Sequence, residues 1–151
     1  MIKLRKQFLF FSILSGTIIL DQWTKKLAIS QLPNGDSISV FKGLFYLTYT
    51  TNKGAVFGML KVLNPIFFII MTFALISLLL IFLKKLRNHP GFAVLLGGII
   101  GNLIDRIRFG YTVDFIDFRF WPVFNISDIC LCTGVALLFL QMIKDKDVLT
   151  G

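Results

Sequence analysis

PIFFIIMTFALISLLLIFL, residues 65–83, is a run of 19 residues without one charged side chain. A helix needs about 20 mostly apolar residues to cross the hydrocarbon core of a bilayer, so this run predicts a membrane-spanning helix at about 63–83. The whole chain has the same character, because 56% of its 151 residues are hydrophobic and only 16% are charged. Soluble domains are about 45–50% apolar and about 25% charged. We therefore predict an α-helical integral membrane protein, with a single domain over residues 1–151.

Three further apolar segments flank this run, at about 7–29, 91–109 and 126–143, which predicts four transmembrane helices. Basic residues before the first segment imitate the start of a signal peptide. No small-x-small cleavage site follows, however, so an uncleaved helix fits better.

The segment between the first two predicted spans has a different amino-acid composition. Asn34-Gly35 is a strong turn signal, and residues 37–41 and 44–51 are rich in β-branched and aromatic side chains. This pattern predicts a small antiparallel β element at about 36–51, outside the hydrocarbon. Residues 54–60 are expected to form a short interfacial helix or a loop, and residues 111–123 a connection rich in aromatic side chains.

The basic residues indicate the orientation. Eight Lys and Arg lie in short segments at the two termini and in the loop at 84–90, and the other eight lie on the opposite side over longer connections. Because dense positive charge marks cytoplasmic segments, we expect a multi-pass protein with both termini in the cytoplasm. The net charge of +8 does not indicate nucleic-acid binding, since the basic residues are dispersed and partly flank apolar runs.

No metal site is expected. Cys130 and Cys132 are two residues apart in an apolar run, and side chains with that spacing do not face each other on a helix. His89 has no partner with metal-ligand spacing.

This topology places seven polar residues at or near the outer ends of the first, third and fourth spans. They are Asp21, Asn102, Asp105, Arg106, Asp114, Asn125 and Asp128. A carboxylate at mid-bilayer costs about 2.5–3.5 kcal/mol, so such residues usually face inward and have a function. Structural roles stay open for several of them: Asp105 and Arg106 could form an ion pair, and the two asparagines could form hydrogen bonds between helices. Gly97 and Gly101 form a small-xxx-small pair, which favours contact between helices.

Asp114 and Asp128 are the candidate catalytic pair. Asp114 lies between the apolar residues Val113 and Phe115, and Asp128 lies at the start of the fourth span, where the helix dipole favours an anion. Two carboxylates at one site share a proton, which supplies one base and one acid together. Asp117 is a rival partner that spacing alone leaves open. The sequence contains no G-x-S-x-G, H-E-x-x-H or phosphate-binding loop to suggest other chemistry.

Five polar segments, in order along the chain, resemble the motif set of signal peptidase II, the bacterial lipoprotein signal peptidase. They are Asp21-Gln22-x-Thr24-Lys25, Asn52-x-Gly54-Ala55, Gly97-Gly98-x-x-Gly101-Asn102-x-x-Asp105-Arg106, Val113-Asp114-Phe115 and Phe124-Asn125-x-x-Asp128. Each alone is a weak signal, but all five in this order, on a chain with four predicted spans, are a strong one. The resemblance covers roughly residues 8–143.

The resemblance implies an intramembrane aspartic endopeptidase with Asp114 and Asp128 as its dyad. Its substrates would be prolipoproteins whose cysteine already carries diacylglycerol, and cleavage before that cysteine would free the signal peptide. The implied enzyme lies in the bacterial cytoplasmic (inner) membrane, with its active site at the outer face and membrane lipids around it. We expect a monomer without a cofactor.

The resemblance also implies roles for other residues. Those matching positions that line or support the family's site are Asn52, Gly54, Asn102, Arg106 and Asn125. Those expected to have structural or supporting roles are Asp21, Lys25 and Asp105.

The sequence departs from the family pattern at two positions. Ser127 stands where the family usually has Ala, and Thr112 where an apolar residue is common.

The main alternative function is a small transporter or channel that uses the outer-face aspartates for ions. That function predicts polar residues at several depths, whereas here they gather at one face. A purely structural membrane scaffold would need no pair of outer-face carboxylates.

Overall fold

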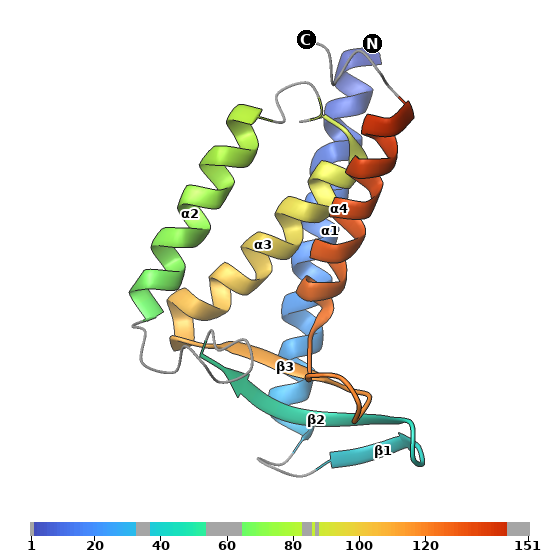
Figure 1. Ribbon diagram of the computed structural model, residues 1–151, viewed down its shortest axis with the longest axis vertical. Helices are drawn as coiled ribbons and strands as arrows, with labels where there is room; N and C mark the ends of the chain where they lie inside the picture. Colours follow the sequence, from blue (N-terminus) through green and yellow to red (C-terminus); the bar gives the residue numbers. More distant parts are fainter. Residues whose placement is uncertain (1, 33–36, 54–64, 83–85, 87, 145–151) are drawn as a thin grey trace.

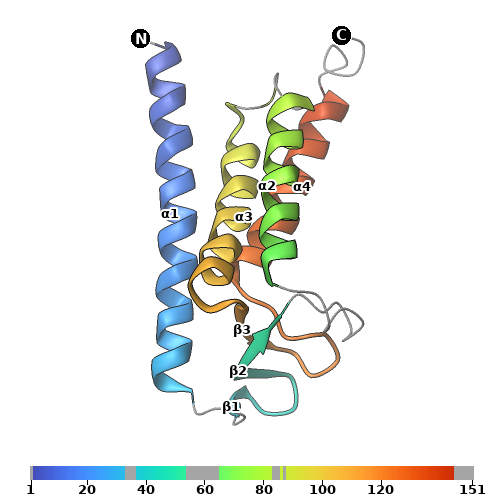
Figure 2. The same ribbon diagram turned by 90° about the vertical axis from the view of Figure 1, so that its left-hand side faces the viewer.

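The computed structural model describes residues 2–32, 37–53, 65–82, 86 and 88–144. Its elements, in chain order, are α1 (Ile2–Gln31), β1 (Ser37–Phe41), β2 (Phe45–Asn52), α2 (Pro65–Phe82), α3 (Pro90–Phe109), β3 (Thr112–Asp117) and α4 (Ile126–Lys144). Figures 1 and 2 show the helices side by side and the sheet across one end of them. The start of α1 and the end of α4 both lie at the end of the bundle opposite the sheet.

The four predicted helices are confirmed, with α1 longer than expected. It spans 30 residues, from Ile2 to Gln31, because its basic first turns and its polar last turns continue the helix of the apolar segment. Asp21 therefore lies ten residues before the helix ends rather than near its end.

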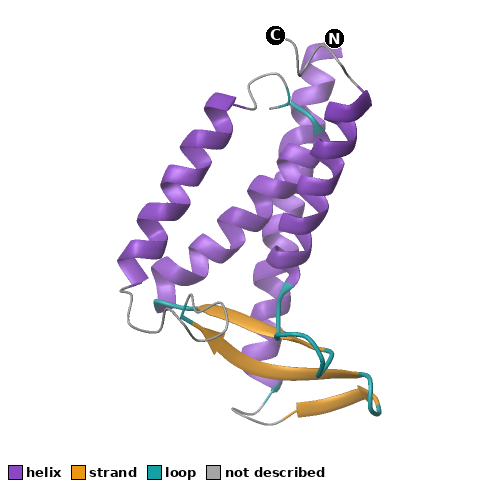
Figure 3. Ribbon diagram, in the orientation of Figure 1, coloured by secondary structure: helices purple, strands orange, loops and turns teal. Residues whose placement is uncertain are grey.

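The predicted β element is also confirmed, but the sheet has a third strand that the sequence analysis read as a connection. The strand order is β1-β2-β3, and both pairings are antiparallel (Figure 3). Strand β3 falls in the segment 111–123, where Thr112 pairs with Asn52 and Asp114 with Thr50. Its six residues are too short for a periodic signal to stand out, and its two aspartates are residues that strands usually avoid. Pairing with β2 therefore decides its conformation.

A left-handed residue connects α3 to this strand. Gly110, with φ 78°, ends α3, and its N–H donates to the carbonyl of Arg106. Glycine takes this conformation without steric cost and is common just after a helix. The turn brings β3 directly back beneath the end of α3.

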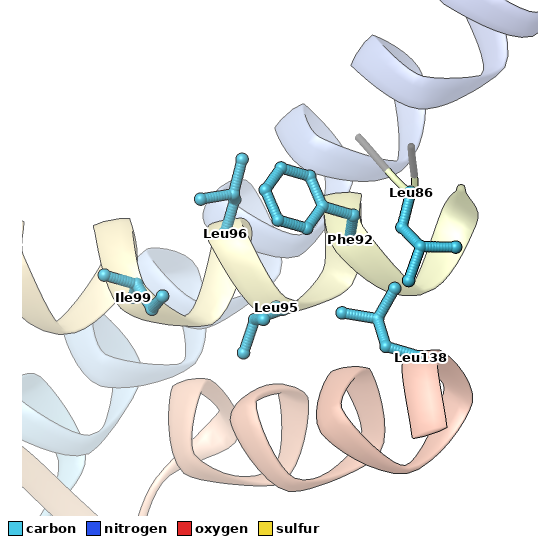
Figure 4. Packing of buried hydrophobic residues seen from close by; sticks show 6 residues of the cluster. All are labelled: Leu86, Phe92, Leu95, Leu96, Ile99 and Leu138. Atoms are coloured by element: carbon cyan, nitrogen blue, oxygen red, sulfur yellow. The ribbon is translucent and has the colours of Figure 1, made fainter. Parts of the chain in front are cut away.

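Helix α3 lies at the centre of the helical part, where it packs against α1, α2 and α4. An apolar cluster surrounds its first half, made of Leu86, Phe92, Leu95, Leu96, Ile99 and Leu138 (Figure 4). Gly134 lets α4 approach closely, since a Cβ there would lie 2.6 Å from the backbone nitrogen of Leu95. At the other end, Ala28 of α1 and Leu32, the residue that follows α1, pack on Phe115 of β3 and so join helix to sheet.

Among the described helices, α4 alone is long and apolar enough to qualify as a membrane span, with 19 residues and a mean hydropathy of 2.0. Residues Ile66–Ile81 of α2 form a shorter apolar helix. Helices α1 and α3 carry charged residues within their length. Three of these, Asp21, Lys25 and Asp105, are buried inside the protein.

Candidate active site

Asp128 lies in the first turn of α4 and is locked to the residue that precedes the helix. The N–H of Asp128 donates to Asn125 Oδ1 at 3.0 Å, and the N–H of Asn125 donates to Asp128 Oδ2 at 3.2 Å. This reciprocal arrangement resembles a capping box, in which two N–H groups at a helix start find side-chain acceptors. The local sequence Asn-x-x-Asp therefore fixes the carboxylate at the start of the helix.

The side-chain amide of Asn125 continues from this cap to the second aspartate. Its Nδ2 donates to Asp114 Oδ1 at 2.6 Å and also lies 3.2 Å from the carbonyl of Val113. Asn125 is completely buried, with an exposed fraction of 0%. One residue therefore contacts both predicted catalytic aspartates.

Asp114 comes from β3 and is the more buried of the two, since Asp128 is only partly buried. Burial raises the pKa of Asp114, and the nearby charge of Asp128 raises it further. Hydrogen bonds from Asn52 and Asn125 and the charge of Lys25 oppose this shift, and the resulting pKa is about 7. A carboxylic acid that holds its proton near neutral pH beside a second carboxylate has the electrostatics of a general acid–base pair.

Asn102 connects the two aspartates to α3. Its Nδ2 donates to Asp128 Oδ1 at 2.9 Å, and its Oδ1 accepts from Asn125 Nδ2 at 3.1 Å. The same Oδ1 accepts from Lys25 Nζ at 3.0 Å. The amide orientation of Asn102 is fixed by these partners, because its oxygen faces two donors and its nitrogen faces a carboxylate.

A buried ion cluster lies behind Asn102. Lys25 Nζ is 2.9 Å from Asp21 Oδ2 and 2.8 Å from Asp105 Oδ2. Asp21 Oδ1 accepts from the N–H of Ser127, and Asp105 Oδ2 accepts from the N–H of Val113. The cluster thus joins α1 and α3 to the residues directly before Asp114 and Asp128. These are the three residues for which a structural or supporting role is predicted from the sequence.

Sequence reasoning singled out neither Gln22 nor the backbone contacts of the cluster. Gln22 Nε2 donates to Asp105 Oδ1 at 2.9 Å and lies 3.2 Å from both Asp21 Oδ2 and the carbonyl of Gly101. The first motif contains Gln22, but only the folded chain reveals its acceptors on α3.

Small residues allow the helices to approach here, as expected for Gly97 and Gly101. A Cβ on Gly97 would lie 2.7 Å from Thr17 of α1. A Cβ on Gly101 would lie 2.6 Å from Asp21 Oδ2 and would clash with the Ser127 hydroxyl. That hydroxyl is buried and has no hydrogen-bond partner among the residues that the structure describes.

Asp117, the rival partner, is directed elsewhere. Its Oδ2 accepts from Thr48 Oγ1 at 2.9 Å, and its Oδ1 accepts from the N–H of Arg119 at 2.7 Å. The Arg119 guanidinium lies 3.6 Å from the same carboxylate. Asp117 therefore stabilises the sheet and its following turn, away from Asn125.

Arg106 lies outside the ion cluster, and Gly54 lies outside the described residues. The structure does not pair Arg106 with Asp105: the Asp105 carboxylate faces Lys25, and the Arg106 guanidinium lies 5.8 Å from the ring centre of Phe68 on α2. Its Nε is buried and unpartnered within the described residues. Gly54 and the predicted interfacial segment at 54–60 lie outside the described residues.

The structure also shows how the possible metal ligands and the two cysteines are arranged. Within the described part of the chain, no group of three His, Cys, Asp or Glu side chains is arranged to hold a metal ion. Cys130 and Cys132 are free thiols.

Comparison with known proteins identifies the family. The family model for signal peptidase (SPase) II matches residues 13–144. The chain belongs to the signal peptidase II family. This confirms the resemblance predicted from the five polar segments and makes the chain a member of a family of aspartic peptidases.

Single proteins of known identity are also similar to this signal peptidase II over most of their length. The lipoprotein signal peptidase of Halothermothrix orenii is 44% identical over 135 residues, covering 87% of this chain and 92% of the relative. That of Halalkalibacterium halodurans is 39% identical over 146 residues, covering 91% and 94%. A bacterial membrane enzyme solved by the in meso method at 2.3 Å resolution has a similar fold, with a TM-score of 0.79 and 34% identity over 91% of this chain and 88% of that one.

Proposed function

We propose that this signal peptidase II is a membrane endopeptidase that removes the signal peptide from prolipoproteins. It cleaves before a cysteine that already carries diacylglycerol. The observation that carries the proposal is the pair Asp114 and Asp128, both bonded to the buried side chain of Asn125, in a chain 44% identical to a lipoprotein signal peptidase.

The two carboxyl groups have different roles, one as the acid and the other as the base. Asp114, the more buried, carries the shared proton at neutral pH, and Asp128 is the base. Asp128 takes a proton from water as the water oxygen bonds to the scissile carbonyl carbon, and Asp114 donates a hydrogen bond to the carbonyl oxygen. When the C–N bond breaks, the proton held by Asp128 passes to the leaving amine. The dyad thus returns to its starting state.

The surrounding residues hold this geometry. Asn125 and Asn102 orient the two carboxylates, and the ion cluster of Asp21, Lys25 and Asp105 fixes the backbone before each of them. Asn52 supports Asp114 through a hydrogen bond. Arg106 and Gly54 are proposed to contact the substrate, since both match positions that line the family's site.

The enzyme lies in the bacterial cytoplasmic membrane, with four spanning helices and both termini in the cytoplasm. Large apolar side chains exposed along different helices support this, including Phe8 at 76%, Ile81 at 69% and Phe139 at 62%. Such surfaces are stable in lipid and are a liability in water. The sheet and the dyad then lie at the outer face, where a lipid-anchored substrate presents its cleavage site.

The transporter alternative fits the molecule less well. A path for ions needs polar groups at successive depths. The first half of α3 instead packs in the apolar cluster around Phe92 and Leu95, and the buried carboxylates gather near its second half.

The test compares the parent enzyme with Asp114→Asn, Asp128→Asn and the matched control Asp117→Asn, each purified in detergent. The substrate is a diacylglyceryl-modified prolipoprotein, followed by its mass shift on a gel. We expect the dyad variants to lose about 10²–10⁴-fold in rate and the control to cleave like the parent enzyme.

Other outcomes would change the assignment. Normal cleavage by either dyad variant would make that aspartate structural. If the parent enzyme never cleaves, the peptidase function is wrong, and ion flux in liposomes would test the transporter alternative.

A further inference from the structure

A cavity lies at the end of the molecule opposite the sheet. It occupies about 440 Å³ between the start of α1, the turn before α3 and the end of α4. These segments meet at the end of the bundle farthest from the sheet in Figures 1 and 2. Its volume falls within the range of about 300–1,000 Å³ typical of small-ligand sites. No residue of the candidate active site lines it.

Polar side chains from three parts of the chain line this cavity. They are Lys6 of α1, Asn88 and His89 of the turn, and Gln141 of α4. His89 Nδ1 accepts the N–H of Gly91 at 3.1 Å, so in the neutral ring the proton lies on Nε2, which is a donor. Among the described residues, neither Lys6 Nζ nor the amides of Asn88 and Gln141 have a hydrogen-bond partner, and no carboxylate lines the cavity. The described lining therefore offers a positive charge and several donors, and the only side-chain acceptors that Asn88 and Gln141 add to it are neutral amide oxygens.

The other side of the cavity is apolar. Phe10 and Leu86 line it, and Leu86 belongs to the apolar cluster drawn in Figure 4. Phe10 also stacks on Phe92 of that cluster, with ring centres 6.5 Å apart. A ligand that is anionic at one end and apolar at the other would match both sides of the cavity.

We propose that this cavity binds the phosphodiester headgroup of an anionic phospholipid. The phosphate accepts from Lys6, His89 and Gln141, and the first part of an acyl chain packs on Phe10. Basic pockets between membrane helices on the cytoplasmic side are suited to such headgroups. The proposal goes beyond peptidase activity and rests on the membrane placement given above, with this end of the bundle in the cytoplasmic leaflet.

The test measures lipid binding to the full-length protein in a neutral detergent by native mass spectrometry. Phosphatidylglycerol is compared with phosphatidylcholine of the same acyl chains, and inorganic phosphate is added as a competitor in a separate series. The variants are Lys6→Gln and His89→Asp. The second keeps a good helix-capping acceptor but replaces the donor with a negative charge. Arg5→Gln is the matched control, because Arg5 is exposed and does not line the cavity.

We expect phosphatidylglycerol to bind more tightly than phosphatidylcholine. Lys6→Gln should weaken phosphatidylglycerol binding about fivefold, the effect of one basic side chain near anionic lipid. His89→Asp should abolish the preference, and Arg5→Gln should leave it unchanged. Equal binding of the two lipids, or an equal effect of Lys6→Gln and Arg5→Gln, would overturn the proposal. Displacement by inorganic phosphate without any lipid preference would assign the site to soluble phosphate and also overturn it.

This result is independent of the proposed function. Asp128→Asn removes the proposed base at the other end of the molecule, so it should bind phosphatidylglycerol like the parent enzyme. Failure of the peptidase assignment would leave that binding unchanged, and failure of lipid binding would leave cleavage in detergent unchanged.

Discussion

The two halves of α3 are held by different kinds of contact. The first half packs Phe92, Leu95 and Leu96 against apolar neighbours, whereas the second half places Asn102 and Asp105 among hydrogen bonds and ion pairs. Lipid tails are as apolar as these side chains, so the first half depends on shape and close packing. In the second half Asn102 and Asp105 are buried beside specific polar partners, because an unpaired buried polar group carries a large desolvation cost. Polar partners therefore fix the site far more narrowly than apolar packing fixes the opposite end.

Removing the cation of the polar half should have the largest effect. Lys25→Met leaves Asp21 and Asp105 buried without their shared partner, which we expect to lower the free energy of unfolding by about 3–5 kcal/mol and to abolish cleavage. The measurement is unfolding by a denaturing detergent together with the prolipoprotein assay. Lys26→Met, at an exposed position of the same helix, is the control. Equal stability of the two variants would show that the cluster contributes little.

A truncation in the apolar half should cost less and should spare the chemistry. Leu138 is 4% exposed and packs in the apolar cluster, so Leu138→Ala should lower the free energy of unfolding by about 2–3 kcal/mol. The rate per folded molecule should stay unchanged. Leu140, 54% exposed on the same helix, supplies the control Leu140→Ala. A lower rate per folded Leu138→Ala molecule would mean that the two halves are coupled.

The pH dependence tests the electrostatics of the polar half. Burial and the charge of Asp128 raise the pKa of Asp114 to about 7, so the dyad loses its shared proton above that pH. The cleavage rate should then fall about tenfold for each further pH unit, close to 1.4 kcal/mol.

The same proton affects stability with a definite sign. Because the pKa of Asp114 is raised by folding, its stabilising contribution is complete below about pH 4 and is lost as the pH rises through about 7. Asn52→Ala removes a hydrogen bond that lowers this pKa, and should move the alkaline limb of the rate profile to higher pH. A rate that stays flat from pH 6 to 9 would argue against a shared proton.

The smallest expected effect concerns the Ser127 hydroxyl, which lies beside the polar half and has no partner in the described part of the chain. Ser127→Ala removes this buried, unpaired group and should raise the free energy of unfolding by about 1 kcal/mol. Ser77→Ala is the contrasting variant, because Ser77 Oγ donates to the carbonyl of Phe73 at 2.9 Å and its loss should not stabilise the protein. A less stable Ser127→Ala variant would mean that the hydroxyl has a partner in solution, such as a bound water.

Several features of the site could be predicted from the sequence. Local patterns were sufficient for the cap formed by Asn125 and Asp128, because both residues lie within one helical turn. Local patterns failed for Asp105, which has an arginine beside it in sequence but pairs with Lys25 of another helix. They also failed for β3, whose conformation depends on pairing with β2, sixty or more residues earlier in the chain.

The sequence by itself determined the four helices, the hairpin of β1 and β2, the family and the two candidate catalytic aspartates. These follow from apolar run length, local turn chemistry and short motifs, all of which are properties of neighbouring residues. Only the tertiary structure decided that Asn125 joins the two aspartates, that Asp117 belongs to the sheet, and that Lys25 holds Asp21 and Asp105 together. The physical reason is that a buried polar group is stable only beside a specific partner, and these partners come from segments that meet only after the helices have packed.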